Sequence, residues 1–159
     1  LPVIITLIAV LFILLPKYDR RYAGFEQSKD IYAIILFATT GFLLVMELIF
    51  LLIGAGYDLP VITIVPALIG FLFIVLGSLM PYIHRNTTMG IRLPWTMKSE
   101  DVWKKTHDHG GPVFMAGGIL TVIGSIVTGI WAMALMLVIV IGMTAYISVW
   151  SYRYAKTAS

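Results

Sequence analysis

The chain has 159 residues, of which 60% are hydrophobic and 12% are charged, and its formal net charge is +3. A soluble domain normally contains about 25% charged residues, so a chain this apolar must place most of its surface in lipid and is predicted to be an integral membrane protein. The absence of cysteine excludes disulfides, thiol catalysis and thiolate metal sites.

Apolar segments predict the membrane spans. A spanning helix needs about 20 apolar residues to cross about 30 Å of hydrocarbon, and four segments reach this length. Residues 1–15 are equally apolar but cover only roughly 22 Å at about 1.5 Å per residue, so the first turns of this helix are expected to be missing. The sequence therefore predicts a single transmembrane domain over residues 1–159, an all-α bundle with spans at residues 1–15, 31–53, 60–83, 112–130 and 131–152.

Basic residues predict the orientation. All 11 lysines and arginines lie in three segments: the loop between the first two predicted spans, residues 84–111, and the C-terminal tail. The turns at 54–59 and 128–131 contain none. The positive-inside rule places the basic segments in the cytoplasm, so Leu1 is predicted to lie outside and the C-terminus inside. An odd number of spans with an outside start fits an N-terminal helix that this sequence lacks.

Glu47 is the one ionisable residue within a predicted span. An intramembrane carboxylate is costly unless it is paired or hydrated, which makes it a candidate functional residue. It lies about two turns from the outer end of its helix, where it could also reach interfacial water or be protonated. A small transporter or channel that uses Glu47 is therefore an alternative function, although no second intramembrane charge offers a partner for a proton relay.

Small residues are spaced four apart along the span at 112–130. Such residues let helix backbones approach closely, which favours helix association in lipid. The stripe is predicted to pack against another helix, with the last span as the expected partner. Its members are Gly117, Thr121, Ser125 and Gly129.

Residues 84–111, here called the motif loop, interrupt the apolar sequence with charges, tryptophans and histidines. The stretch from Asn86 to Gly90 is predicted to form a turn, because asparagine and threonine favour turns and glycine supplies a positive φ. Pro94 excludes a helix through the residue before it. Thr96 or Ser99 can then cap a new helix.

The new helix is predicted to be short and amphipathic and to lie at the cytoplasmic face, between the third and fourth spans. Glu100 and Asp101 suit its positive N-terminal end. Gly110 and Gly111 are predicted to end it, so that the next span begins at Pro112.

Three functional interpretations of the motif loop are open. His107 and His109, with Asp108 between them, could bind a metal, but residues two apart do not share a helical face and no metalloprotease-type spacing is present. Arg92 could bind a phosphate, but an enzyme acting on lipid phosphate through Arg92, His107 and Asp108 lacks an evident nucleophile. The third interpretation is a docking surface for a cytoplasmic partner. No catalytic residue, metal or cofactor is therefore predicted.

The motif loop resembles the signature of SdpI-type immunity proteins. That pattern runs approximately N-x-x-x-G-I-R-x-P-W-T, followed by V-W-x-x-T-H and a glycine. The stretch LPKYDRRYAGF at residues 15–25 is similar to the loop after the family's second span, with Arg20 where proline is frequent. The matching residues expected to order the motif and dock a partner are Asn86, Gly90, Arg92, Pro94, Trp95, Thr96, Trp103, Thr106 and His107.

The resemblance implies a function that composition and spacing do not show. Members protect a bacterium against a secreted peptide toxin that damages the membrane. The best-known member also implies signalling, by holding a cytoplasmic repressor at the membrane when toxin is present. The expected partners are thus the toxin outside, a repressor inside and membrane lipids, with no direct contact to nucleic acid. Members usually begin with a further helix and an extracellular segment, which this sequence lacks.

Overall fold

The computed structural model describes Thr6, Val10, Leu14, residues 24–127 and residues 129–158. Every regular element within these residues is helical, which confirms the all-α prediction for this part of the chain. The order is α2 (Gly24–Gln27), α3 (Lys29–Gly54), α4 (Val61–Leu79), the 3-10 turn η2 (Met80–Tyr82), α5 (Glu100–Val127), the 3-10 turn η3 (Gly129–Trp131) and α6 (Ala132–Thr157).

Four of these helices are long and apolar enough to cross a membrane. They are α3, α4 with η2, α5, and η3 with α6, and each contains most of one predicted span. The predicted first span at residues 1–15 lies outside the described residues, apart from three isolated positions, so the five-helix count stays a prediction.

The predicted break before Pro112 is wrong, because α5 runs without interruption from Glu100 to Val127. The expected short amphipathic helix is therefore the first part of a long helix. Gly110 and Gly111 do not end the helix but serve its packing: a Cβ at position 111 would lie 2.7 Å from the carbonyl oxygen of Gly77, and one at position 110 would lie 3.0 Å from a methyl group of Ile91. Helix-breaking residues are tolerated in membrane helices where such packing compensates.

Reciprocal glycines bring α4 and α5 together. Gly70 faces Gly118 and Gly77 faces Gly111, and an added Cβ at each would lie 2.5–2.7 Å from the opposing glycine's carbonyl oxygen. The two glycines on each helix are seven residues apart, so they lie on one face of each antiparallel helix. Backbones this close pack by dispersion and by weak Cα–H···O contacts, which replace the hydrophobic driving force that lipid does not supply.

The predicted small-residue stripe packs in part against α6. A Cβ at Gly117 would lie 2.7 Å from the sulfur of Met143 on that helix. Thr121 and Ser125 are buried, and their hydroxyls donate to carbonyl oxygens of α5 itself, at 2.8 and 2.7 Å. Gly129 lies beyond the end of α5, in η3, with φ +53 and open space around it. The stripe as the structure shows it therefore ends at Ser125.

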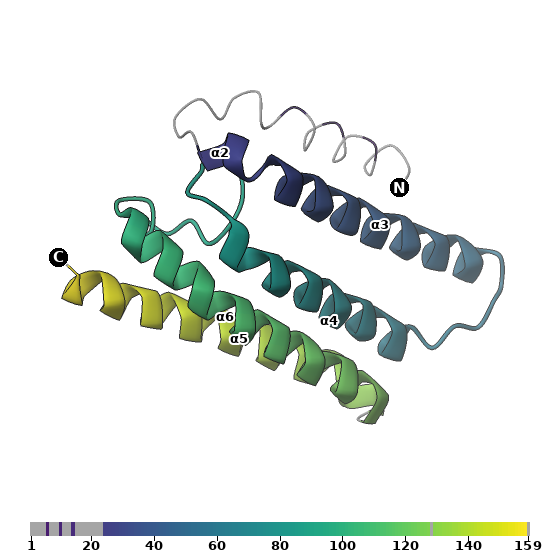
Figure 1. The fold of residues 1–159 in the computed structure, drawn as a ribbon. Helices are drawn as coiled ribbons and strands as arrows, with labels where there is room; N and C mark the ends of the chain where they lie inside the picture. Colours follow the sequence, from purple (N-terminus) through teal and green to yellow (C-terminus); the bar gives the residue numbers. More distant parts are fainter. Residues whose placement is uncertain (1–5, 7–9, 11–13, 15–23, 128, 159) are drawn as a thin grey trace.

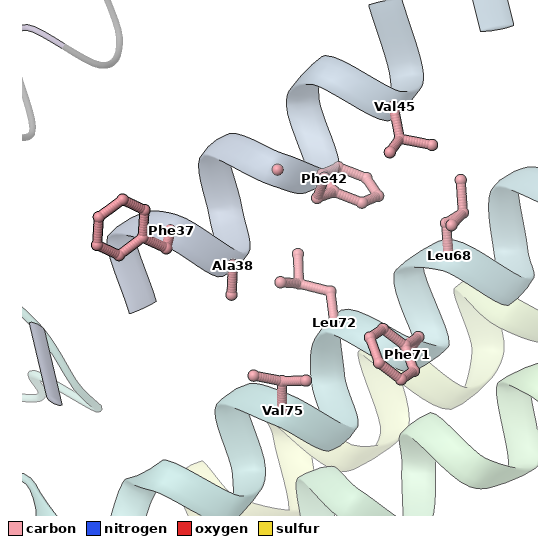
Figure 2. A pocket seen from close by; sticks show the side chains of 9 residues that line it. Phe37, Ala38, Phe42, Val45, Leu68, Phe71, Leu72 and Val75 are labelled. Atoms are coloured by element: carbon pink, nitrogen blue, oxygen red, sulfur yellow. The ribbon is translucent and has the colours of Figure 1, made fainter. Parts of the chain in front are cut away.

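Helix α3 lies at the edge of the bundle beside α4 (Figure 1). A groove of about 260 Å³ separates the middle of the two helices, and Phe42 of α3 and Leu72 of α4 point into it (Figure 2). A Cβ added at Gly41, also in the groove, would have no neighbour within 4 Å among the described residues. The firm attachment of α3 is instead at its first turns, where Tyr32 packs with Ile83, Met89 and Trp103.

Candidate functional site

The motif loop is folded rather than solvated. Its residues 100–111 form the first part of α5, and its residues 84–99, between η2 and α5, form no regular helix. Both parts contribute polar side chains to the interior. Buried polar groups are normally hydrogen-bonded, so a burial pattern of this kind indicates a specified structure. The fully buried members, each with 0% exposure, are Asn86, Thr96, Trp103, Thr106 and His107.

Asn86 holds the first turn of the loop through its side-chain amide. Its Oδ1 accepts hydrogen bonds from the backbone N–H groups of Thr88 and Met89, both at 2.8 Å. Its Nδ2 donates to the carbonyl oxygen of His84 at 2.8 Å. The predicted turn is confirmed, and the asparagine stabilises it by replacing backbone partners that the loop cannot supply.

Trp103 and His107 form the centre of the site. Their rings stack at 4.2 Å with an interplanar angle of 22°. The indole Nε1 of Trp103 donates to the carbonyl oxygen of Ile83 at 2.8 Å, which ties α5 to the end of η2.

The hydrogen bonds of His107 fix its tautomer. The backbone N–H of Ile91 donates to Nε2 at 2.9 Å, and a backbone N–H can only donate, so Nε2 is unprotonated. The proton is therefore on Nδ1, which donates to the carbonyl oxygen of Trp103 at 2.9 Å. Both ring nitrogens are used, and the neutral ring serves as a crosslink between the loop and α5 rather than as a metal ligand.

Gly90 allows the loop to pass directly over this stack. Its φ is +102, a conformation that side chains resist. A Cβ there would lie 2.5 Å from Nε2 of His107 and 3.0 Å from the indole of Trp103. Conformation and space therefore both require glycine, and the predicted positive φ is confirmed.

The Pro94–Trp95–Thr96 turn joins the loop to α6. The hydroxyl of Thr96 accepts from the N–H of Leu93 at 2.9 Å and lies 2.8 Å from the carbonyl oxygen of Ile91, to which it can donate. The indole Nε1 of Trp95 donates to Oγ of Ser151 at 2.9 Å. The loop is thus anchored to α6 as well as to α5.

Arg92 differs from these buried residues because it is exposed. Its guanidinium donates to the carbonyl oxygen of Thr87 within the same loop. The contact orders the side chain on the surface, and the remaining N–H groups of the guanidinium suit a carboxylate or phosphate partner. Pro94 and Gly90 are also exposed, but glycine has no side chain, so Arg92 and Pro94 are the motif positions whose side chains are best placed for contact with another molecule.

Thr106 is the one motif residue without an assigned contact for its polar atom. It lies on α5 between Trp103 and Gly110, fully buried, and its hydroxyl has no hydrogen-bond partner among the described residues. The structure gives no physical account of this hydroxyl.

Sequence reasoning missed Ser28 and Arg85. Ser28 is fully buried before α3, and its Oγ accepts from the backbone N–H of His84 at 2.9 Å. Arg85 forms a salt bridge with Glu100, with 2.9 Å between Nε and Oε2, and its Nη1 donates to the carbonyl oxygen of Met97 at 3.1 Å. Glu100 was explained by the helix N-terminus alone, and because Arg85 lies 15 residues earlier in the chain, no local spacing indicated the ion pair.

His109 faces away from His107, as residues two apart on a helix must. Its ring stacks on Trp150 of α6 at 4.2 Å, and its Nε2 lies 3.2 Å from the hydroxyl of Tyr146. Tyr154 continues the stack and donates to Asp101 at 2.8 Å. Within the described residues no three histidine or acidic side chains are grouped to hold a metal.

Glu47 lies on α3, partly buried, away from the motif loop. In the part of the chain that the structure describes, no salt bridge involves it. The groove beside α3 is lined by apolar residues and glycine only.

The geometry defines a class of protein: a multi-pass helical membrane protein whose long loop is folded against the ends of its helices. Residues 82–150 match the model of the SdpI/YfhL protein family. The chain is also 27% identical to the immunity protein SdpI of Bacillus subtilis (strain 168), over 98% of this chain and 75% of that protein. No solved structure matches.

These comparisons confirm the resemblance to SdpI-type proteins. The family match contains the whole motif loop together with α5 and most of α6, which are the elements that build the site. Neither match names an enzyme. A location in the cell membrane with several spans agrees with the four apolar helices.

Proposed function

We propose that this chain protects a bacterium against a secreted peptide toxin that damages the membrane, and that the motif loop signals toxin binding by docking a cytoplasmic repressor. The relative named an immunity protein supports the first part. The observation that carries the second part is the rigid crosslinking of the loop to α5 and α6, with Arg92 and Pro94 left on its surface. A preformed surface binds a partner without the entropy cost of ordering a loop.

The proposed orientation places the motif loop and the C-terminus in the cytoplasm, with the turns after α3 and α5 outside. This follows from the distribution of lysine and arginine. The toxin would then meet the outer half of the bundle, and the repressor would meet the loop.

Helix α3 is suited to couple the two sides. Its middle packs loosely against α4, whereas its start is fixed to the motif loop by Ser28, which binds His84, and by Tyr32, which packs against Trp103. A shift of α3 on toxin binding would therefore move the contacts that Ser28 and Tyr32 make with the motif loop, which also carries Arg92. Such coupling requires two conformations with different affinity for the toxin.

The test is survival of a toxin-sensitive bacterium exposed to a sporulation-delay-type peptide while it expresses this chain or its variants. The wild type is expected to protect. Arg92→Ala is expected to abolish recruitment of the repressor to the membrane fraction, and Lys29→Ala, which removes an exposed charge outside the motif loop, is the matched control. Immunoblots of the membrane fraction must show equal amounts of each protein.

The two parts of the proposal fail separately. A well-inserted wild type that gives no protection contradicts the immunity function. Recruitment that survives Arg92→Ala, or that is lost equally in Lys29→Ala, contradicts the docking role of the loop while leaving immunity intact.

A further inference from the structure

A groove lies beside the last turns of α6, next to the Trp95 turn, and encloses about 390 Å³. Its lining combines two aromatic rings with two cations at one end of a spanning helix. The lining residues are Trp95, Ser148, Val149, Tyr152, Arg153 and Lys156. We infer that this groove binds an anionic phospholipid, with the lipid phosphate between Arg153 and Lys156.

The position of the groove along α6 matches the depth of lipid head groups. The 20 residue steps from Ala132 to Tyr152 rise about 30 Å at about 1.5 Å each. The hydrocarbon core of a bilayer is also about 30 Å thick. With Ala132 at one boundary, Tyr152 lies at the other, and Arg153 and Lys156 lie just beyond it, where phosphate groups are found.

The aromatic wall of the groove is fixed before any lipid binds. The indole of Trp95 is hydrogen-bonded to Ser151 at 2.9 Å and meets the ring of Tyr152 edge to face at 5.2 Å. Amphipathic rings prefer the head-group level of a membrane. The apolar side chain of Val149 lines the groove one turn deeper, where it can contact the first methylene groups of an acyl chain.

The charge of the groove selects an anion. Arg153 and Lys156 are three residues apart, so they lie on the same face of α6, and both are exposed. Helix α6 contains no acidic residue, and neither does the stretch at 91–98. Asp101, on α5, accepts the hydroxyl of Tyr154, and Arg153 forms no salt bridge within the described residues. Basic pockets at the ends of membrane helices are the usual sites for anionic head groups.

The inference distinguishes between lipids. Phosphatidylglycerol carries a net negative charge, which the positive charges of Arg153 and Lys156 attract. Phosphatidylcholine carries the same phosphate with a quaternary ammonium group, which the cations would repel. The groove should therefore prefer phosphatidylglycerol, although the two lipids present equal apolar surface.

The experiment is native mass spectrometry of the full chain in detergent, titrated with phosphatidylglycerol or phosphatidylcholine. Each cation near an anionic lipid changes affinity by about fivefold, so the double variant Arg153→Gln/Lys156→Gln should bind phosphatidylglycerol roughly 25-fold more weakly than the wild type. The matched control, Lys29→Gln/Lys105→Gln, removes the same charge from exposed positions outside the groove and should lose less than about fivefold.

Three results would overturn the inference: equal affinity of the wild type for the two lipids, equal losses in the two double variants, or no loss in either. Because the substituted side chains are exposed, folding is expected to be unaffected, and circular dichroism of each variant checks this.

Discussion

Replacing Gly90 with alanine tests whether the Trp103–His107 stack holds the motif loop. The substitution has two costs. The first is the positive φ of +102, which a side chain adopts at a cost of about 1–2 kcal/mol. The second is steric, because the new Cβ would lie 2.5 Å from Nε2 of His107 and would force apart the hydrogen bond from Ile91. A buried donor without its partner costs about 1–3 kcal/mol. The expected loss is therefore roughly 2–5 kcal/mol.

Gly56 provides the matched control. Its φ is +93, close to that of Gly90, but no atom of the described residues lies within 4 Å of the position a Cβ would take. Gly56→Ala should therefore cost only the conformational part, about 1–2 kcal/mol. The free energy of unfolding can be measured by SDS titration of the purified proteins, followed by tryptophan fluorescence, to which Trp103 contributes together with three other tryptophans. Equal losses in the two variants would refute the argument that His107 and Trp103 restrict the loop.

Three further predictions follow from the contacts of the site and from the glycine contacts between α4 and α5. His107→Leu should cost about 1–3 kcal/mol of unfolding free energy by stranding the N–H of Ile91, whereas His107→Gln keeps an acceptor and should lose less; equal losses would contradict the crosslink. Gly77→Ala should cost roughly 1–3 kcal/mol of unfolding free energy by overpacking the glycine contact between α4 and α5. Its control is Gly142→Ala, whose new Cβ meets no described residue and which should cost under about 1 kcal/mol. An unfolding titration that ranks the two otherwise refutes the close contact. Trp95→Phe removes the hydrogen bond to α6 and should raise amide hydrogen exchange at residues 93–98, while unchanged exchange would show that the bond does not hold the turn.

Much of the fold could be predicted because hydrophobic length dictates membrane spans. The limits of α3, and of α4 taken together with η2, differ from the predicted spans by one or two residues, a common difference at helix ends. The prediction failed at Gly110, Gly111 and Pro112, where local preferences favour a helix end. Glycine is required at position 111 by close contact with Gly77, which lies 34 positions away, and not by a reversal of the chain. Local reasoning cannot see such a contact.

The glycine contacts between α4 and α5 could nevertheless have been predicted from the sequence. Gly70 and Gly77 on one span, and Gly111 and Gly118 on another, have the same seven-residue spacing. Two antiparallel helices with matched spacings can superimpose both pairs at once. The four-residue stripe from Gly117 drew attention first, because a regular small-residue spacing on a single helix is easier to recognise than a match between two helices.

The candidate site was predicted by residue type but not by role. Asn86 and Gly90 were expected in a turn, and the structure places them there. Thr96 was expected as one of two candidate helix caps, but its hydroxyl instead contacts Leu93 and Ile91 within the turn before α5. The stack of Trp103 on His107 and the bonds that cross from the loop to α5 could not be predicted, since they depend on how residues 83–99 fold back over the helix. Sequence spacing along α5 placed the two rings on one face, but it did not identify what covered them.

The distinction between buried and exposed motif residues changes how the motif should be interpreted. Trp103 and His107 have no exposed surface, so they cannot touch a toxin or a repressor, and their substitution would disturb folding before it affected recognition. Most of the motif that defines the resemblance is therefore a folding motif that shapes the loop. Contact with a partner must rest on what the folded loop presents, and among the motif residues Arg92 has the chemistry to bind an acidic group there. Loss of function in a Trp103 variant would measure the scaffold, whereas loss of function in an Arg92 variant with normal insertion would measure the interaction itself.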